Sequence, residues 1–340
     1  AAIQRFFPDP RRAPDVSIDT VYFPARKAPG TLRIFVQGES SAAGFPYGRW
    51  ASPAAMLQER LQHAYPDRDV EVINTAMAAV TSYVLLDFAD EIIAQQPDAV
   101  IVYAGHNEYL GVGGVGSSLV SAKSPGLARA VSQLRRLHLY RSLERFVSSF
   151  GPARDPLSDR EGTLMARVAA ERSIPLGSPL YEQGLTQFRG NLERLLDKYR
   201  KAGIPVFIGT LASNERDQAP FISGPDTAAG DSAAQHFAKA RNLDREHRLD
   251  EARAEYIAAK DSDELRFRAP ESFNALIRET AARHGATLVD VHGALRAASR
   301  DGIIGSDLML EHVHPNAEGY FRLAGAFYPA LVQWAGTPSV

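Results

Sequence analysis

Short apolar runs alternate along the chain with longer stretches of helical periodicity. The runs are rich in Val and Ile and mostly apolar throughout, as is typical of strands that are buried on both faces of a sheet. They span residues 32–37, 70–74, 99–103, 205–210 and 287–291. The amphipathic stretches between and after them span residues 53–64, 83–95, 181–202, 270–284 and 316–334. Strands that alternate with helices predict an α/β fold around a mainly parallel five-stranded sheet.

Two segments interrupt this alternation. Residues 111–179 begin Gly-rich and carry a helical stretch around residues 134–150. Residues 214–268 contain a loop and then a helical pair over residues 233–261, which resembles a single tetratricopeptide-type repeat. We interpret both segments as insertions in one domain of residues 31–340, preceded by an irregular N-terminal arm of residues 1–30.

Composition narrows the classes of partner and chemistry. The chain has 38 Lys and Arg against 40 Asp and Glu, a formal net charge of −2, so it offers no basic field for nucleic acid. It has no Cys, which excludes thiolate catalysis, disulfides and Cys-ligated zinc. It contains no run of about 18 apolar residues that would predict a membrane span. Residues 1–12 do not resemble a signal peptide, and a leader or membrane anchor upstream of residue 1 stays open.

A turn of small residues, 38–44, directly follows the first predicted strand and contains Ser40 and Ser41. A serine at this junction would stand at the carboxyl edge of the sheet, close to the free N–H groups of the next helix. Ser40 is the candidate nucleophile, and Ser41 competes with it. The alternative is an ordinary turn in which either serine caps a helix.

A second turn, residues 311–316, precedes the last amphipathic stretch and contains two histidines. A serine hydroxyl needs a neutral imidazole to take its proton, and that imidazole needs a carboxylate on its far nitrogen. His314 is the candidate base, and Glu311 lies three residues before it. The alternatives are a surface histidine pair, or a metal site formed by His312 and His314.

The turns after the second and third predicted strands supply candidate oxyanion donors. Asn107 follows the third strand and can donate its side-chain amide, while Ala79 can donate a backbone N–H. The alternative for Asn107 is a turn-forming residue. The carboxyl ends of parallel strands meet at one edge of a doubly wound sheet, so we expect these turns to converge on Ser40.

These residues, in this order, resemble the SGNH (GDSL-type) hydrolases. Segments 38–40, 74–82, 105–108 and 311–314 match the four blocks of that family. The resemblance implies a flavodoxin-like three-layer α/β/α sandwich. It also implies a catalytic triad of Ser40, His314 and Glu311, with an oxyanion hole formed by the N–H groups of Ser40 and Ala79 and the side chain of Asn107.

The sequence departs from the family pattern at four positions. Glutamate replaces the usual aspartate at Glu39, Glu108 and Glu311, and Ala79 stands where the family usually has glycine. Asp307 is therefore an alternative third member of the triad. An alanine at position 79 is disfavoured if the backbone there needs a positive φ.

The resemblance further implies a serine esterase without metal or cofactor, acting on short-acyl (O-acetyl) esters of small molecules, carbohydrates or cell-envelope polymers. The alternatives are an O-acyltransferase that uses the same site, and a non-catalytic polysaccharide-binding protein that kept the fold. The turn around Asn107 and residues 214–217 are similar to those of a subgroup of larger bacterial members, which are often exported or membrane-anchored. This likeness predicts an extracytoplasmic location. Glu39, Glu108, Arg216 and Asp217 are candidate residues that support the pocket.

Overall fold

The centre of the protein is a five-stranded sheet in which every strand runs parallel to its neighbours, in the order β2-β1-β3-β4-β5. The computed structural model describes residues 21–116, 173–225 and 231–336. The strands are β1 (Leu32–Gly38), β2 (Val70–Asn74), β3 (Ala99–Tyr103), β4 (Val206–Gly209) and β5 (Thr287–Val289). The strand order reverses beside β1, as in flavodoxin-like sheets. The predicted α/β fold is confirmed, and each strand lies within two residues of its predicted ends.

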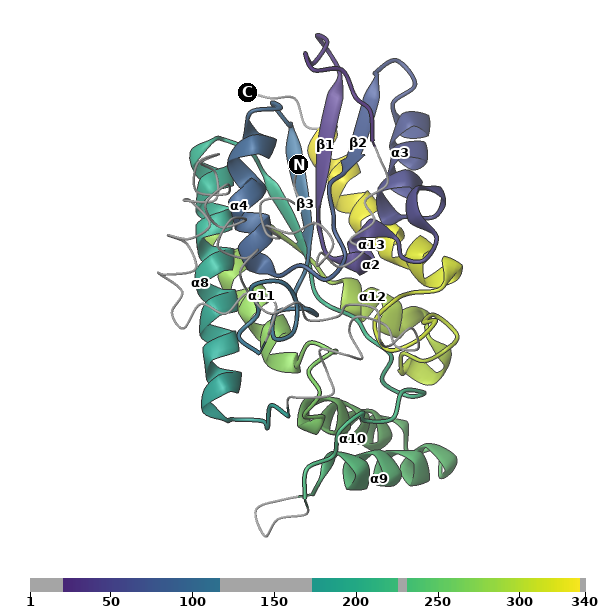
Figure 1. Ribbon diagram of the computed structural model, residues 1–340. Coiled ribbons are helices and arrows are strands. Elements are labelled where there is room, and N and C mark those ends of the chain that lie inside the picture. The colour runs from purple at the N-terminus through teal and green to yellow at the C-terminus, as the bar shows by residue number, and fades with distance from the viewer. Residues whose placement is uncertain (1–20, 117–172, 226–230, 337–340) are drawn as a thin grey trace, which may run out of the picture.

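Helices cover both faces of the sheet and complete the three layers (Figure 1). One layer consists of α4 (Ser82–Ile93), α8 (Pro179–Lys201) and α11 (Glu271–His284), with α8 in the middle. The other layer consists of α3 (Pro53–Ala64), α13 (Ala317–Ala335) and α12 (Val291–Ala298), with α13 in the middle. Ser52 and Ser178 accept the backbone N–H three residues on and so cap α3 and α8.

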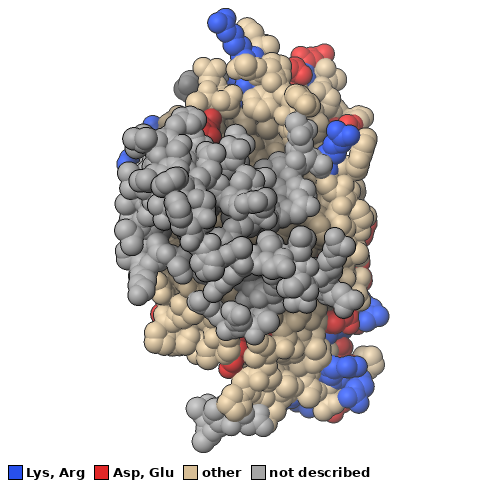
Figure 2. Space-filling model, in the orientation of Figure 1, with Lys and Arg blue, Asp and Glu red and all other residues tan. Residues whose placement is uncertain are grey.

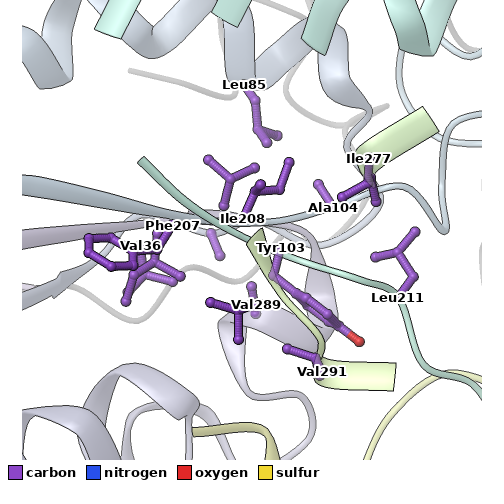
Figure 3. Close-up of a cluster of buried hydrophobic side chains, with 14 of the residues drawn as sticks. Val36, Leu85, Tyr103, Ala104, Phe207, Ile208, Leu211, Ile277, Val289 and Val291 are labelled. Atoms are coloured by element: carbon purple, nitrogen blue, oxygen red, sulfur yellow. The ribbon is translucent and has the colours of Figure 1, made fainter. Parts of the chain in front are cut away.

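The hydrophobic core lies between the sheet and both helical layers. Figure 3 shows Leu85 from α4 and Ile277 from α11 on one side of the strands, with Val291 from α12 on the other. All residues of β1 and β3 are buried. Because the central strands are buried on both faces, the sheet is a rigid platform whose carboxyl edge carries the turns of the candidate site.

A helical hairpin extends beyond this carboxyl edge (Figure 1). It consists of α9 (Ala233–Arg245) and α10 (Leu249–Ser262), with a small apolar cluster of its own: Ala240, Leu243, Ala252, Tyr256 and Ile303. Figure 2 shows acidic and basic side chains intermixed over this end of the molecule. The predicted helix pair is present, but its likeness to a tetratricopeptide repeat is not confirmed.

Several sequence predictions concern residues that the structure does not describe. Most of the insertion at residues 111–179, with the helical stretch around residues 134–150, lies outside the described residues, as does most of the N-terminal arm. The division into an arm and one domain therefore stays a prediction. Within the described ranges, no helix is both long and apolar enough to cross a lipid bilayer.

Candidate active site

Ser40 is the first residue of a one-turn helix, α2 (Ser40–Ala43), that directly follows β1. Gly38 allows this turn to sit close to the sheet, because a Cβ there would collide with the Tyr103 carbonyl oxygen and the Ala42 side chain. The N–H groups of a first helical turn have no acceptor inside the helix. Ser40 therefore brings both a hydroxyl and an available backbone N–H to the carboxyl edge of the sheet.

His314 comes from the far end of the chain and meets Ser40. Its Nε2 lies 2.7 Å from Ser40 Oγ, across a separation of 274 residues. Its Nδ1 faces Glu311 Oε1, which also accepts the His314 backbone N–H at 2.8 Å. The carboxylate keeps the proton on Nδ1, so Nε2 is the nitrogen that accepts the hydroxyl proton of Ser40.

The two competing residues make other contacts. Ser41 Oγ is buried and donates to the Val313 carbonyl oxygen at 3.0 Å, which ties α2 to the histidine segment. Asp307 Oδ2 accepts the backbone N–H of Arg300 at 2.8 Å. The structure thus places Ser40 and Glu311, and not these alternatives, against the imidazole of His314.

The His314 imidazole is buried enough to be neutral at pH 7. Burial lowers the pKa of His314 to about 4, against an ordinary value of 6.5. Burial likewise lowers the pKa of His312 and of His106 to about 3. A neutral imidazole is the form that a general base requires.

Esterase activity should therefore persist below the ordinary pKa of histidine. Protonation of His314 removes the base, so we expect kcat/KM to fall with decreasing pH only below 6.5, with its midpoint nearer 4. The measurement is a profile of kcat/KM from pH 3.5 to 8. In this range the unfolded chain binds more protons at these histidines than the folded one, so their contribution to stability also falls from pH 6.5 downward. Circular dichroism at each pH separates the two effects, and a midpoint at or above 6.5 with the fold intact contradicts the prediction.

Glu39 joins the nucleophile turn to the turn that carries Asn107. Its Oε1 accepts the Gly105 N–H at 3.0 Å, and its Oε2 accepts the Asn107 N–H at 3.1 Å. Burial raises the pKa of Glu39 to about 8, and the charge of Glu108 adds to the rise. Glu39 therefore fixes the backbone position of Asn107.

Glu108 holds the same turn from the other side. Its Oε1 accepts the Ser82 hydroxyl at 2.8 Å and the Gln187 amide at 2.9 Å, and its Oε2 accepts the Ser82 N–H at 2.9 Å. Burial raises the pKa of Glu108 to about 7. Because Ser82 opens α4 and Gln187 lies on α8, this carboxyl ties the turn to one helical layer.

The side-chain amide of Asn107 is an unused donor. Its Nδ2 is buried and has no hydrogen-bond partner among the residues that the structure describes. A buried donor without a partner costs free energy, which a ligand oxygen can offset. Such a donor, in a turn that Glu39 ties to the nucleophile turn, is what an oxyanion hole requires.

Ala79 lies next to the Asn107 turn because the two loops are bonded to each other. Val112 donates its N–H to the Ala79 carbonyl at 2.8 Å, and Gly111 donates to the Asn107 carbonyl at 2.6 Å. A Cβ on Gly111 would lie 2.8 and 2.9 Å from these two carbonyl oxygens, so glycine permits the close approach. Ala79 itself has a φ of +55°, the strained conformation that its replacement of the usual glycine predicts.

Ala79→Gly should relieve this strain without harming the site. The left-handed region costs a non-glycine residue about 1–2 kcal/mol, which the substitution removes. The greater conformational freedom of glycine in the unfolded chain offsets about 0.4–1 kcal/mol of this stabilisation. We expect the free energy of unfolding in urea to rise by up to about 1 kcal/mol, with esterase activity retained. A loss of stability would show that Ala79 is not strained.

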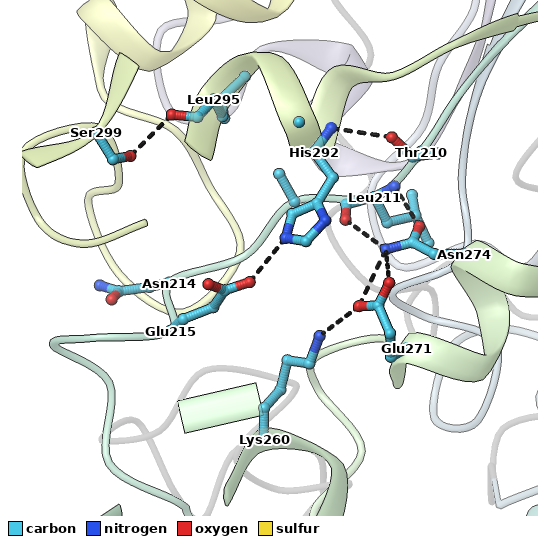
Figure 4. A network of polar contacts seen from close by, with 12 residues as sticks. Thr210, Leu211, Asn214, Glu215, Lys260, Glu271, Asn274, His292, Leu295 and Ser299 are labelled. Carbon is cyan, nitrogen blue, oxygen red and sulfur yellow. Dashed lines mark hydrogen bonds and ion pairs between the residues drawn. The ribbon is translucent and has the colours of Figure 1, made fainter. Parts of the chain in front are cut away.

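Polar residues beneath the loop that follows β4 bond it to two helices, α11 and α12. In Figure 4 His292 Nε2 points to Glu215 Oε1, and Lys260 of α10 points to Glu271 of α11. These contacts measure 2.8 Å and 3.3 Å. Asn274 donates to the Leu211 carbonyl at 3.0 Å. Although burial opposes it, the surrounding carboxylates raise the pKa of Lys260 above its ordinary value. This network positions the loop whose Asn214 N–H donates to the His312 carbonyl at 2.9 Å.

Arg216 and Asp217 lie farther along the same loop. Arg216 pairs with Asp244 at 2.9 Å and with Asp301 at 3.0 Å, which ties the loop to α9. Asp217 Oδ2 accepts the N–H and the hydroxyl of Ser306, both at 2.7 Å. Both residues line a polar cavity of about 330 Å³ beside α9. Their predicted support of a substrate pocket stays a prediction.

Comparison with known proteins identifies the family. The model of the GDSL-like Lipase/Acylhydrolase family matches residues 36–322, which is most of the chain. The chain belongs to this family. The predicted SGNH (GDSL-type) membership is thereby confirmed, and the family is one of esterases, lipases and acylhydrolases. No curated protein sequence matches the chain significantly.

Solved structures similar to this GDSL family member include three hydrolases. The acetyl xylan esterase AlAXEase is 15% identical, with 88% of this chain and 99% of that chain covered and a TM-score of 0.46. A lipase/acylhydrolase from Enterococcus faecalis is 14% identical, with 89% and 96% covered and a TM-score of 0.44. The psychrotrophic esterase EstA from Pseudoalteromonas sp. is 13% identical, with 91% and 100% covered and a TM-score of 0.43.

Sequence reasoning missed two contacts at the site. The Phe45 ring lies 4.8 Å from that of His314, centroid to centroid. His312 directs its Nδ1 to Glu311 Oε2, so one carboxylate serves two imidazoles. The one-residue spacing in the histidine segment is a signal for the second contact, whereas nothing in the sequence indicates the first.

Proposed function

We propose that this GDSL family member is a serine esterase that cleaves short-acyl esters, O-acetyl esters of carbohydrates among them, through an acyl-serine intermediate. The observation that carries the proposal is the 2.7 Å contact between Ser40 Oγ and His314 Nε2. The unpartnered amide of Asn107, among the described residues, supports it. A non-catalytic binding protein has no need of this combination.

Acylation begins when Ser40 Oγ attacks the ester carbonyl carbon and its proton passes to His314 Nε2. The Glu311 carboxylate stabilises the imidazolium that forms. The carbonyl oxygen becomes an oxyanion and accepts hydrogen bonds from Asn107 Nδ2 and from the N–H groups of Ser40 and Ala79. The imidazolium then protonates the leaving alcohol oxygen, the C–O bond breaks, and the acyl group remains on Ser40.

Deacylation repeats these steps with water as the nucleophile. His314 takes a proton from water, the resulting hydroxide attacks the acyl carbon, and the proton returns to Ser40 Oγ as the acid leaves. Apart from this water, the steps use side chains and backbone N–H groups of this chain. The short acyl group, the carbohydrate alcohol and an extracytoplasmic location derive from the family resemblance.

The test is hydrolysis of p-nitrophenyl esters with acyl chains of two to twelve carbons. We expect turnover with the highest kcat/KM at the shortest chains, and free acid as the main product even with a sugar acceptor present. Acylated sugar in preference to free acid would instead favour the O-acyltransferase. Absence of turnover at every chain length would contradict the proposed esterase.

A further inference from the structure

Four rings stand in a row across the histidine end of the site. The centroid distances are 4.8 Å from Phe45 to His314, 6.2 Å from His314 to His312 and 5.4 Å from His312 to Phe221. Buried Phe267 backs the row at 5.3 Å from His312. The two end rings are apolar yet 51% exposed at Phe45 and 42% at Phe221. Exposed apolar surface that is continuous with a catalytic histidine indicates a binding surface.

The backbone fixes both end rings in place. Phe45 donates its N–H to the Ser40 carbonyl at 3.1 Å, and its carbonyl accepts the Tyr320 hydroxyl at 2.7 Å. Phe221 donates its N–H to Asp263 Oδ2 at 3.0 Å. Asp263 is in turn paired with the buried Arg268 at 3.2 Å, outside this row. The exposure of the two rings is therefore a property of a held backbone and not of a loose loop.

The role of His314 as the base determines which part of a bound ester lies against this row of rings. His314 Nε2 must hand its proton to the leaving alcohol oxygen, so that oxygen lies beside the imidazole. The carbonyl oxygen is held elsewhere, by Asn107 and the two backbone N–H groups. Rings in contact with His314 therefore flank the alcohol portion of the ester and not its acyl portion.

We propose that Phe45, His312 and Phe221 form the binding surface for the alcohol portion and select alcohols whose ring presents a flat apolar face. A pyranose, with its axial C–H groups, and a phenyl ring both have such a face. Aromatic rings bind flat apolar groups by stacked or edge-on contact. An acyclic alcohol has no flat apolar face and makes little contact with this surface. The inference rests on the proposed esterase and names the class of its alcohol.

The test compares three acetates that differ only in the alcohol: phenyl acetate, an acetylated methyl glucopyranoside and ethyl acetate. Phe45→Ala and Phe221→Ala should each lower kcat/KM for the two ring alcohols by about 3- to 10-fold, the worth of one aromatic contact. For ethyl acetate we expect little change. All three acetates form the same acetyl-Ser40, so the deacylation rate in a rapid-quench experiment should not change.

Phe321→Ala is the matched control. Phe321 is 46% exposed, lies on α13 and stacks on Arg60, outside the row. It should leave all three kcat/KM values unchanged. A loss confined to the sugar ester, or to the phenyl ester, supports the surface and identifies the alcohol it prefers. An equal loss for all three acetates would mean that the rings serve only to hold His314, and no loss for any would mean that they bind no alcohol. Either result overturns the inference.

A binding measurement separates this inference from the proposed esterase. Methyl glucopyranoside and phenol are titrated into Ser40→Ala protein and followed by NMR, and then into Ser40→Ala/Phe45→Ala protein. Ring alcohols that bind the first and bind the second several-fold more weakly support the surface, even if wild type turns over no ester. Ester turnover without any binding of ring alcohols overturns the surface and leaves the esterase standing.

Discussion

Ser40→Ala should lower kcat for p-nitrophenyl acetate by about 10⁶-fold, which is the loss seen when a triad hydrolase loses its nucleophile. Without the hydroxyl no acyl-serine forms, and His314 has no proton to take. The remaining oxyanion donors should leave a rate of about 10³–10⁴ above that of water. The measurement is initial rate under saturating substrate, with acyl-enzyme sought by mass spectrometry after acid quench. Only the wild type should show the acyl adduct.

Ser41→Ala is the control for this experiment. Ser41 is adjacent in sequence and equally small, but its hydroxyl donates to the Val313 carbonyl. Removal of that donor leaves a buried carbonyl unpaired, which should cost about 1–3 kcal/mol of stability and lower the melting temperature. We expect kcat to change far less than in Ser40→Ala. The reverse ranking, with Ser41→Ala inactive and Ser40→Ala active, would move the nucleophile to Ser41.

Much of the fold could be predicted because its signals are local. Apolar runs and helical periodicity locate β1 to β5 and the five long helices that cover them. The prediction failed at the end of β5, where it extended the strand through Val291, although Val291 begins α12. Asp290 caps that helix by accepting the Gly293 N–H at 3.3 Å. The capping signal is present in the sequence, but the continuous apolar run hides the boundary.

The members of the candidate site could be listed from the residues themselves, whereas the pairing of Ser40, His314 and Glu311 came only from the family resemblance. Parallel strands bring their carboxyl ends to one edge, which is why turns near Ser40, Ala79 and Asn107 converge. Whether Ser40 or Ser41 faces the histidine depends on the turn after Gly38, a matter of backbone dihedrals.

Ion pairs between residues far apart in the chain could likewise not be predicted from the sequence. Arg216 pairs with Asp244 and Asp301, which lie 28 and 85 residues away. A single sequence offers many carboxylates at such separations and nothing that selects among them. The row of rings that includes Phe45 and Phe221 is hidden for the same reason, since it joins three separate segments.

The distinctive element of the histidine segment is a single carboxylate that serves two imidazoles. Glu311 Oε1 accepts the His314 N–H and faces its Nδ1, while Oε2 accepts the His312 N–H at 2.9 Å and faces its Nδ1. The longer side chain of glutamate, relative to the usual aspartate, lets the carboxylate reach both rings. A negative charge so placed orients the base and stabilises it once protonated.

Glu311→Gln should therefore lower kcat by about 10⁴-fold, as loss of the charged triad member does in other serine hydrolases. A glutamine amide has one oxygen, so its NH₂ must face the N–H groups of one histidine, and the imidazolium loses its counter-charge. Loss of that charge also lowers the pKa of His314 further, so the residual activity should persist to lower pH than in the wild type. The matched control is Asp307→Asn, which removes a charge from the same segment at a carboxylate that accepts the Arg300 N–H and, within the described residues, makes no hydrogen bond to a histidine. If Asp307→Asn proved as damaging as Glu311→Gln, with both variants folded, the carboxylate of Glu311 would not be the partner of the base.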